Sequence, residues 1–130
     1  MGGLTCSADE LVEHIGARLL EKIRHYLALS QKSGRVVSGV SCVLRALKTR
    51  KIALVLTASD LAENSRDRLE VGCRAAGIAC RALPLNRVEV GRALGRSPRA
   101  VVALPDGPLV RAIVQTLENF GSISSLFRAK

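Results

Sequence analysis

The chain has 130 residues, of which 48% are hydrophobic and 24% charged, values that suit one folded domain and exclude a disordered chain. A formal net charge of +9 predicts attraction to polyanions, because a positive surface concentrates acidic partners around it. The longest strongly apolar run, residues 52–56, is too short to span a bilayer, so no membrane partner is expected.

The four cysteines predict free thiols rather than a metal site. They stand at positions 6, 42, 73 and 80, form no C-x-x-C pair, and have only two histidines to join them. This spacing is unusual for zinc ligands, so we expect no metal and no cofactor. Reduced thiols and the lack of a secretory signal pattern at the N-terminus predict a cytoplasmic protein.

Helical and strand patterns alternate along the chain. The predicted helices cover about residues 17–32, 39–49, 64–77, 86–95 and 106–121. The predicted strands are short apolar runs at residues 36–38, 52–57, 78–83 and 100–104. This alternation predicts an α/β fold, a three-layer α/β/α sandwich with about four short strands and five helices.

Local signals set the predicted ends of several elements. Asn86 with Glu89 three residues later is a capping-box pattern, and Gly121 is expected to end the last helix. Residues 1–16 are expected to form an N-terminal tail or a helical lead-in, and residues 122–130 a C-terminal tail. The domain itself is expected to span residues 17–121.

Three stretches, in this order and spacing, resemble the kink-turn-binding ribosomal-protein superfamily: LALSQKSGRVVSG, LVLTASDLAENSRDRLEVGCRAAGI and VGRALGRSPRAVVAL. That superfamily includes the archaeal large-subunit protein called seven-Ae and the eukaryotic protein called thirty-e, and the bacterial YlxQ-like branch is the most similar. The resemblance implies an α/β/α sandwich that binds kink-turns, which are RNA internal loops with tandem sheared G·A pairs and a sharp bend.

The resemblance places a first RNA-binding surface at the start of the second predicted helix, at Gly39, Val40, Ser41, Cys42 and Arg45. A helix N-terminus offers free N–H groups and a positive dipole to phosphates or base edges. Many members have Asn and Glu where Ser41 and Cys42 stand, and the shorter Ser41 predicts weaker readout of G·A pairs. Gly39 and Ser41 are equally compatible with plain helix capping.

Two further loops are implied as binding surfaces. The turn after the strand at 52–57 carries Asp60 and Asn64, residue types that are also ordinary in turns and caps. The loop after the VGRAL segment is expected to cover a base flipped out of the kink, and a loop with two arginines suits phosphate as well. Its candidate residues are Arg96, Ser97, Pro98 and Arg99.

Isolated basic residues near these segments are further candidates for phosphate contacts, although charge runs are usually solvated faces. They are Lys32, Arg35, Lys48 and Arg50. Since phosphate contacts carry no sequence information, we expect tolerance to RNA sequence.

No nucleophile elbow, Walker loop or H-E-x-x-H motif occurs in the sequence, so no enzyme is expected. The sequence predicts a non-catalytic, monomeric protein that binds structured RNA of the kink-turn type and is associated with the ribosome or translation. Ribosomal RNA and ribosomal or RNA-processing proteins are the expected partners. A protein–protein interaction module on the same fold, with only general RNA affinity, remains the alternative.

Overall fold

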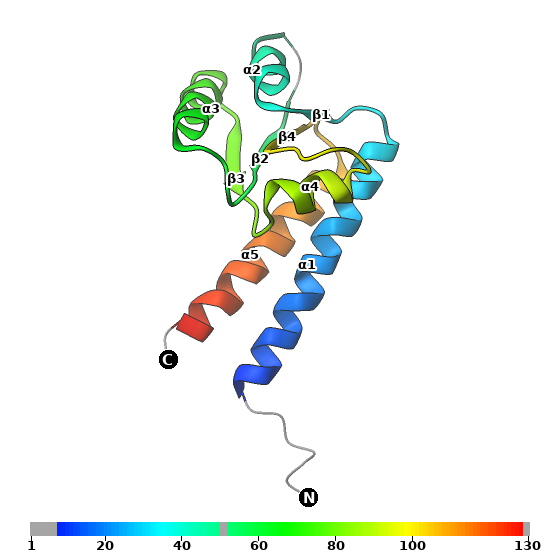
Figure 1. Cartoon of the computed structure of the whole chain (residues 1–130), viewed down its shortest axis with the longest axis vertical. Helices are drawn as coiled ribbons and strands as arrows, with labels where there is room; N and C mark the ends of the chain where they lie inside the picture. The colour runs from blue at the N-terminus through cyan, green and yellow to red at the C-terminus, as the bar shows by residue number, and fades with distance from the viewer. Residues whose placement is uncertain (1–7, 50–51, 129–130) are drawn as a thin grey trace, which may run out of the picture.

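The computed structural model describes residues 8–49 and 52–128, where five helices alternate with four strands (Figure 1). The helices are α1 (Ala8–Lys32), α2 (Val40–Thr49), α3 (Glu63–Ala76), α4 (Arg87–Ala93) and α5 (Pro108–Arg128). The strands are β1 (Val37–Ser38), β2 (Leu54–Thr57), β3 (Ala79–Ala82) and β4 (Val101–Leu104). The predicted number and order of elements are therefore confirmed.

The four strands form one mixed sheet in the order β1-β4-β2-β3. Strands β2 and β3 are parallel, with Leu54 beside Ala79. Strand β4 lies between β1 and β2 and is antiparallel to both. All residues of the two central strands are buried, as expected when helices cover both faces of a sheet.

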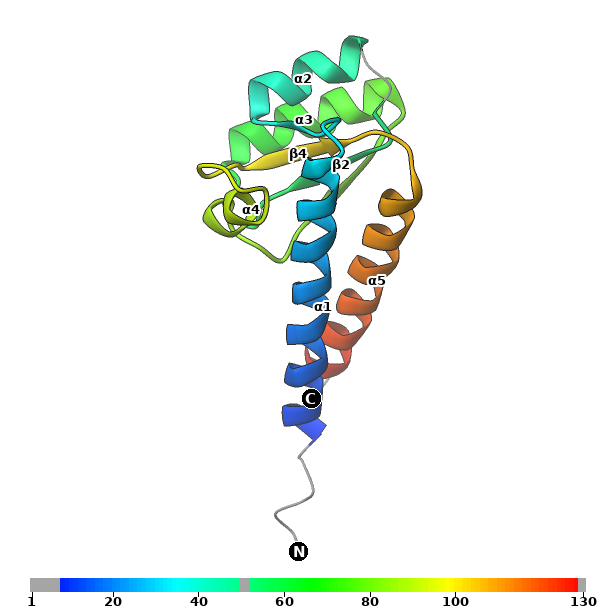
Figure 2. The ribbon, with the colours of Figure 1, turned by 90° about the vertical axis from the view of Figure 1, so that its right-hand side faces the viewer.

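Helices cover the sheet on both sides, so the α/β fold has three layers (Figures 1 and 2). Because side chains alternate along a strand, Leu54 and Leu56 pack with α1, α4 and α5. Val55 faces the other way and packs with α2 and α3. Apolar side chains on both sides therefore hold the sheet in the middle of the molecule.

The capping box predicted for the short helix α4 is present. The Glu89 N–H donates to the Asn86 side chain at 2.9 Å, and the Asn86 N–H donates to the Glu89 carboxylate at 3.0 Å. Two N–H groups at the helix start thus gain partners, which fixes the direction in which α4 leaves β3. The Asp106 carboxylate accepts from the Gly107 N–H at 3.0 Å, just before α5.

The first and last helices extend beyond the predicted spans 17–32 and 106–121. Helix α1 begins at Ala8, which agrees with the helical lead-in that was one alternative for residues 1–16, and α5 continues through Gly121 to Arg128. The two helices lie side by side (Figure 2), and a Cβ at Gly16 would lie 3.8 Å from the Phe120 ring. A glycine costs a helix only about 1 kcal/mol, so packing against a neighbouring helix outweighs it. The division into a domain and two tails stays a prediction.

Replacing Gly121 by Ala tests this longer helix. Gly121 is exposed, lies inside α5 without a positive φ, and a Cβ there would meet nothing within 4 Å. Gly121→Ala is therefore expected to raise the free energy of unfolding by about 0.5–1 kcal/mol in urea titrations. Gly77 ends α3 with φ 71°, so the control Gly77→Ala is expected to lower that free energy by about 1 kcal/mol. Destabilisation by both changes would place a helix end at Gly121.

Candidate functional site

One edge of the sheet brings together the three segments singled out in the sequence. Strand β2 ends at Thr57 beside Val101, where β4 begins. The Gly39 N–H, which follows β1, donates to the Val101 carbonyl at 3.0 Å, and the Ala58 N–H donates to the Ala100 carbonyl at 2.8 Å. The start of α2, the β2–α3 turn and the α4–β4 loop therefore emerge at the same edge.

The start of α2 presents its polar residues to solvent. Ser41 and Cys42 are exposed, whereas Val40 is partly buried and packs against the core between α2 and the sheet. The Gly39 carbonyl accepts the first helical bond, from the Val43 N–H at 2.9 Å. Of these residues, Ser41 and Cys42 are available to a ligand, and Val40 serves packing.

The loop from Gly95 to Arg99 lies directly on α4 at a glycine that the sequence reasoning did not single out. The Arg96 N–H donates to the Gly91 carbonyl at 2.8 Å. A Cβ at Gly91 would overlap the Ser97 carbonyl oxygen and lie 2.8 Å from the Pro98 Cα. Only glycine permits this approach of two backbones. The signal in the sequence was a glycine inside a predicted helix.

Arg99 of this loop is held by neutral oxygen atoms. Its Nε donates to the Ser38 hydroxyl at 3.0 Å. Its Nη1 donates to the Ser97 hydroxyl at 2.7 Å and to the Pro98 carbonyl at 3.2 Å. These bonds fix the guanidinium between the loop and β1 and leave its positive charge uncompensated.

Arg96 is held in a similar way from the end of α1. The Gln31 amide is oriented with its oxygen toward Arg96. This oxygen accepts from Arg96 Nε at 3.3 Å and from Arg96 Nη2 at 3.2 Å. The amide is neutral, so this guanidinium also keeps its charge.

These arginines line a hollow of about 470 Å³, here called the arginine hollow. None of the described residues that line it carries a carboxylate. They are Gln31, Val36, Val37, Ser38, Cys42, Arg45, Ala46, Arg96 and Arg99. The guanidinium groups of Arg96 and Arg99, held by neutral acceptors in a hollow whose lining residues carry no acid, make this a place for a ligand with negative charge.

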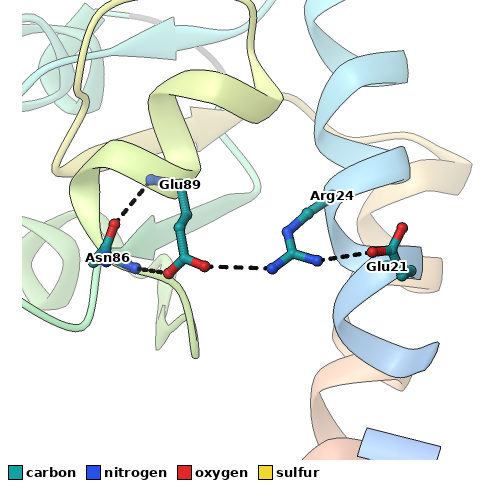
Figure 3. Close-up of polar contacts among 4 residues, drawn as sticks. All are labelled: Glu21, Arg24, Asn86 and Glu89. Carbon is teal, nitrogen blue, oxygen red and sulfur yellow. Dashed lines mark hydrogen bonds and ion pairs between the residues drawn. The ribbon is translucent and has the colours of Figure 1, made fainter. Parts of the chain in front are cut away.

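Carboxylates neutralise arginines elsewhere on the surface. Arg24 lies between Glu21 at 3.0 Å and Glu89 at 3.3 Å, which joins α1 to α4 (Figure 3). On another face, Arg81 pairs with Glu118 at 3.3 Å. The anchors of Arg96 and Arg99 therefore differ in kind from those of the paired arginines.

Asp60 forms such an ion pair with Arg87. Its carboxylate accepts from the Arg87 N–H at 2.8 Å and from the Arg87 Nε at 3.2 Å. Partial loss of hydration raises the pKa of Asp60, but the bonds and charge of Arg87 outweigh it and hold this pKa below its ordinary 3.8. Asp60 thus anchors the start of α4. Asn64 is exposed in the first turn of α3 and is not among the residues lining the arginine hollow.

The isolated basic candidates lie at different places on the surface. Lys32 is exposed in the last turn of α1, next to Gln31. Arg35 lines a second hollow of about 300 Å³ near the start of α5. Lys48 lies in the last turn of α2, roughly 12 Å along the helix from its first residue, Val40. Neither Arg35 nor Lys48 is therefore brought to the arginine hollow, and Arg50 lies outside the described residues.

The cysteines of the described residues show no disulfide. Cys42 is exposed, Cys73 is buried and Cys80 is partly buried. Burial, with the neighbouring Cys80, raises the pKa of Cys73 to about 12, so this thiol stays protonated. Within residues 8–49 and 52–128, no three His, Cys, Asp or Glu residues gather as metal ligands would. In the same part of the chain, every helix is too short or too polar to cross a membrane.

Comparison with known proteins gives a family match over residues 21–107, more than half of the chain. The family is described as the ribosomal protein L7Ae/L30e/S12e/Gadd45 family. The chain is also similar to the RNA-binding protein YlxQ of Bacillus subtilis (strain 168), with 25% identity over 92 residues that cover 71% of this chain and 91% of the relative.

Solved structures share the fold. A protein of unknown function from Bacillus halodurans superposes with a TM-score of 0.69 at 24% identity, over 75% of this chain and 97% of that chain. The 15.5kD RNA binding protein of Giardia lamblia superposes with a TM-score of 0.61 at 17% identity, over 82% of this chain and 90% of that chain. The fold that carries the candidate site is therefore one that solved structures share.

The close approach at Gly91 predicts a specific cost. Gly91→Ala is expected to lower the free energy of unfolding by about 1–3 kcal/mol, because the loop backbone must move away from α4. Gly72→Ala is the matched control, since its Cβ would meet the tip of the Leu47 side chain at 3.2 Å, which can give way. Urea titrations of both variants measure the difference, and equal stabilities would show that the loop is not held at Gly91.

Proposed function

The chain belongs to the ribosomal protein L7Ae/L30e/S12e/Gadd45 family, as its resemblance predicted, and we propose that it is a non-catalytic protein that binds structured RNA at the arginine hollow. The observation that carries this proposal is that the guanidinium groups of Arg96 and Arg99 line one hollow and are held there by neutral acceptors. Arg45 lines the same hollow from α2. The name of the YlxQ relative supports the same class of ligand.

RNA fits this arrangement because its backbone carries one negative charge per nucleotide. Arginine binds phosphate through parallel N–H donors and keeps its charge at all physiological pH values. A net charge of +9 adds long-range attraction, since positive potentials over a surface raise the rate at which polyanions meet it. Affinity at this edge would therefore come mainly from phosphate contacts.

We propose a kink-turn as the form of RNA that is bound. The deep, narrow major groove of a regular RNA helix excludes side chains, whereas a sharply bent internal loop opens it. The start of α2 and the loop of Arg96 to Arg99 flank one hollow, so they could hold both sides of such a bend. With Ser41 and Cys42 at the helix start, recognition of the G·A pairs would be weak relative to recognition of the bent backbone.

The same proposal extends to location and partners. Ribosomal RNA or another structured RNA of translation is the expected ligand, in the cytoplasm and with the protein as a monomer. Ribosomal or RNA-processing proteins would then be neighbours on that RNA.

Titration with a short kink-turn RNA at two salt concentrations tests this function. The control is the same duplex with its G·A pairs replaced by Watson–Crick pairs, which removes the bend. Tighter binding of the kinked RNA at both concentrations is the expected outcome. Equal, strongly salt-dependent binding of both RNAs would contradict kink-turn recognition and favour a protein-interaction module with general RNA affinity.

Arg45→Ala tests whether the hollow contacts phosphate. Arg45 lines the hollow from α2 and is exposed. The variant is expected to bind all RNAs more weakly, and the slope of log K against log salt should fall by about one unit. Arg111→Ala, an exposed arginine of α5 away from the hollow, is the matched control. A slope that Arg45→Ala and Arg111→Ala change equally would remove Arg45 from the site.

A further inference from the structure

We propose that Gln31 and Ser38 are positioning residues for RNA, because they orient Arg96 and Arg99 toward phosphates without neutralising either charge. This inference rests on the proposed RNA-binding function. Both lie in the first of the three stretches that carry the family resemblance, but neither was among the candidate RNA-binding residues. Gln31 stands in the last turns of α1, and Ser38 ends β1.

The contrast between two classes of arginine anchor supports this role. Arg24, Arg81 and Arg87 each pair with a carboxylate at 3.0–3.3 Å. The acceptors of Arg96 and Arg99 are instead an amide oxygen, two hydroxyl groups and backbone carbonyls. A carboxylate within hydrogen-bond distance would cancel much of the guanidinium charge and compete with phosphate. A neutral acceptor orients the group and preserves the charge.

The anchors also leave donors for a ligand. The bonds of Arg99 use Nε and Nη1, and those of Arg96 use Nε and Nη2. Nη2 of Arg99 and Nη1 of Arg96 have no hydrogen-bond partner among the described residues. Each guanidinium is therefore held on one side and open on another, so binding would not have to order a freely moving side chain.

The two anchors come from different elements, and both are partly buried. Gln31 reaches the loop from α1, and Ser38 reaches it from β1. Because Gly91 lets the same loop lie on α4, the loop is held from three sides. Small changes at Gln31 or Ser38 should thus alter the charge or the orientation of one arginine without moving the loop backbone.

Gln31→Glu is the sharpest test, because it keeps the size and shape of the side chain and adds one carboxylate beside Arg96. Binding of the kink-turn RNA at low salt is expected to weaken about 5- to 10-fold, and the salt slope should fall by about one unit, as for the loss of one phosphate contact. Gln115→Glu on the exposed face of α5 changes the net charge equally and serves as the control.

Ser38 tests orientation rather than charge. Ser38→Ala removes the acceptor of Arg99 Nε and is expected to weaken RNA binding several-fold while the salt slope stays near that of the wild type. Ser38→Thr retains a hydroxyl and should restore binding. Urea titrations identify any variant whose loss comes from unfolding, and binding is compared only at protein concentrations corrected for the folded fraction.

The outcomes separate the two proposals. A wild-type protein that binds neither RNA would overturn both the function and the positioning role. If the wild type prefers kinked RNA but Gln31→Glu binds no more weakly than Gln115→Glu, the RNA-binding function stands and the role of Gln31 is overturned. A Ser38→Ala variant with wild-type affinity would overturn the role of Ser38 in the same way.

Discussion

The contact of the loop backbone with α4 at Gly91 is the constraint on which the candidate site depends. It brings Ser97 and Pro98 against the helix without a side chain between them, and so carries Arg99 to within hydrogen-bond distance of Ser38. Helix α4 must itself be fixed for this to work. Glu89 fixes α4 through two interactions: it completes the capping box, and it pairs with Arg24 of α1 (Figure 3).

Some surface arginines form structural pairs with carboxylates, whereas Arg96 and Arg99 line the hollow. Carboxylates that face arginines serve to join elements, as where Asp60 holds Arg87 at the start of α4. Exposed pairs of this kind contribute little to stability, yet they cancel positive charge away from the hollow. Arg96 and Arg99 instead donate to amide, hydroxyl and carbonyl oxygens. The positive charge of these two arginines is thereby available to a ligand where the strands end.

Much of the fold was predictable because periodicity and capping are local properties. The apolar runs at the two central strands, the capping box at Asn86 and the glycine ending α3 all lie where the sequence predicts them. Helix α1 ends at Lys32 as predicted and begins within the segment for which a helical lead-in was one alternative, whereas the predicted end of α5 at Gly121 was wrong. Gly16 and Gly121 resemble helix breaks in sequence, but α1 and α5 pack together along their length, and that gain is not a property of either segment alone.

The sequence by itself determined the class of fold, the basic character of the chain and the three segments that meet at one edge. Tertiary structure decided where each candidate residue lies and which residues it contacts. It committed Asp60 to Arg87, placed Arg35 and Lys48 away from the hollow, and brought Gln31 and Ser38 to the arginines. The physical reason is that net charge and apolar periodicity depend only on the amino-acid sequence. Hydrogen bonds between residues distant in the chain depend on how the helices pack against the sheet.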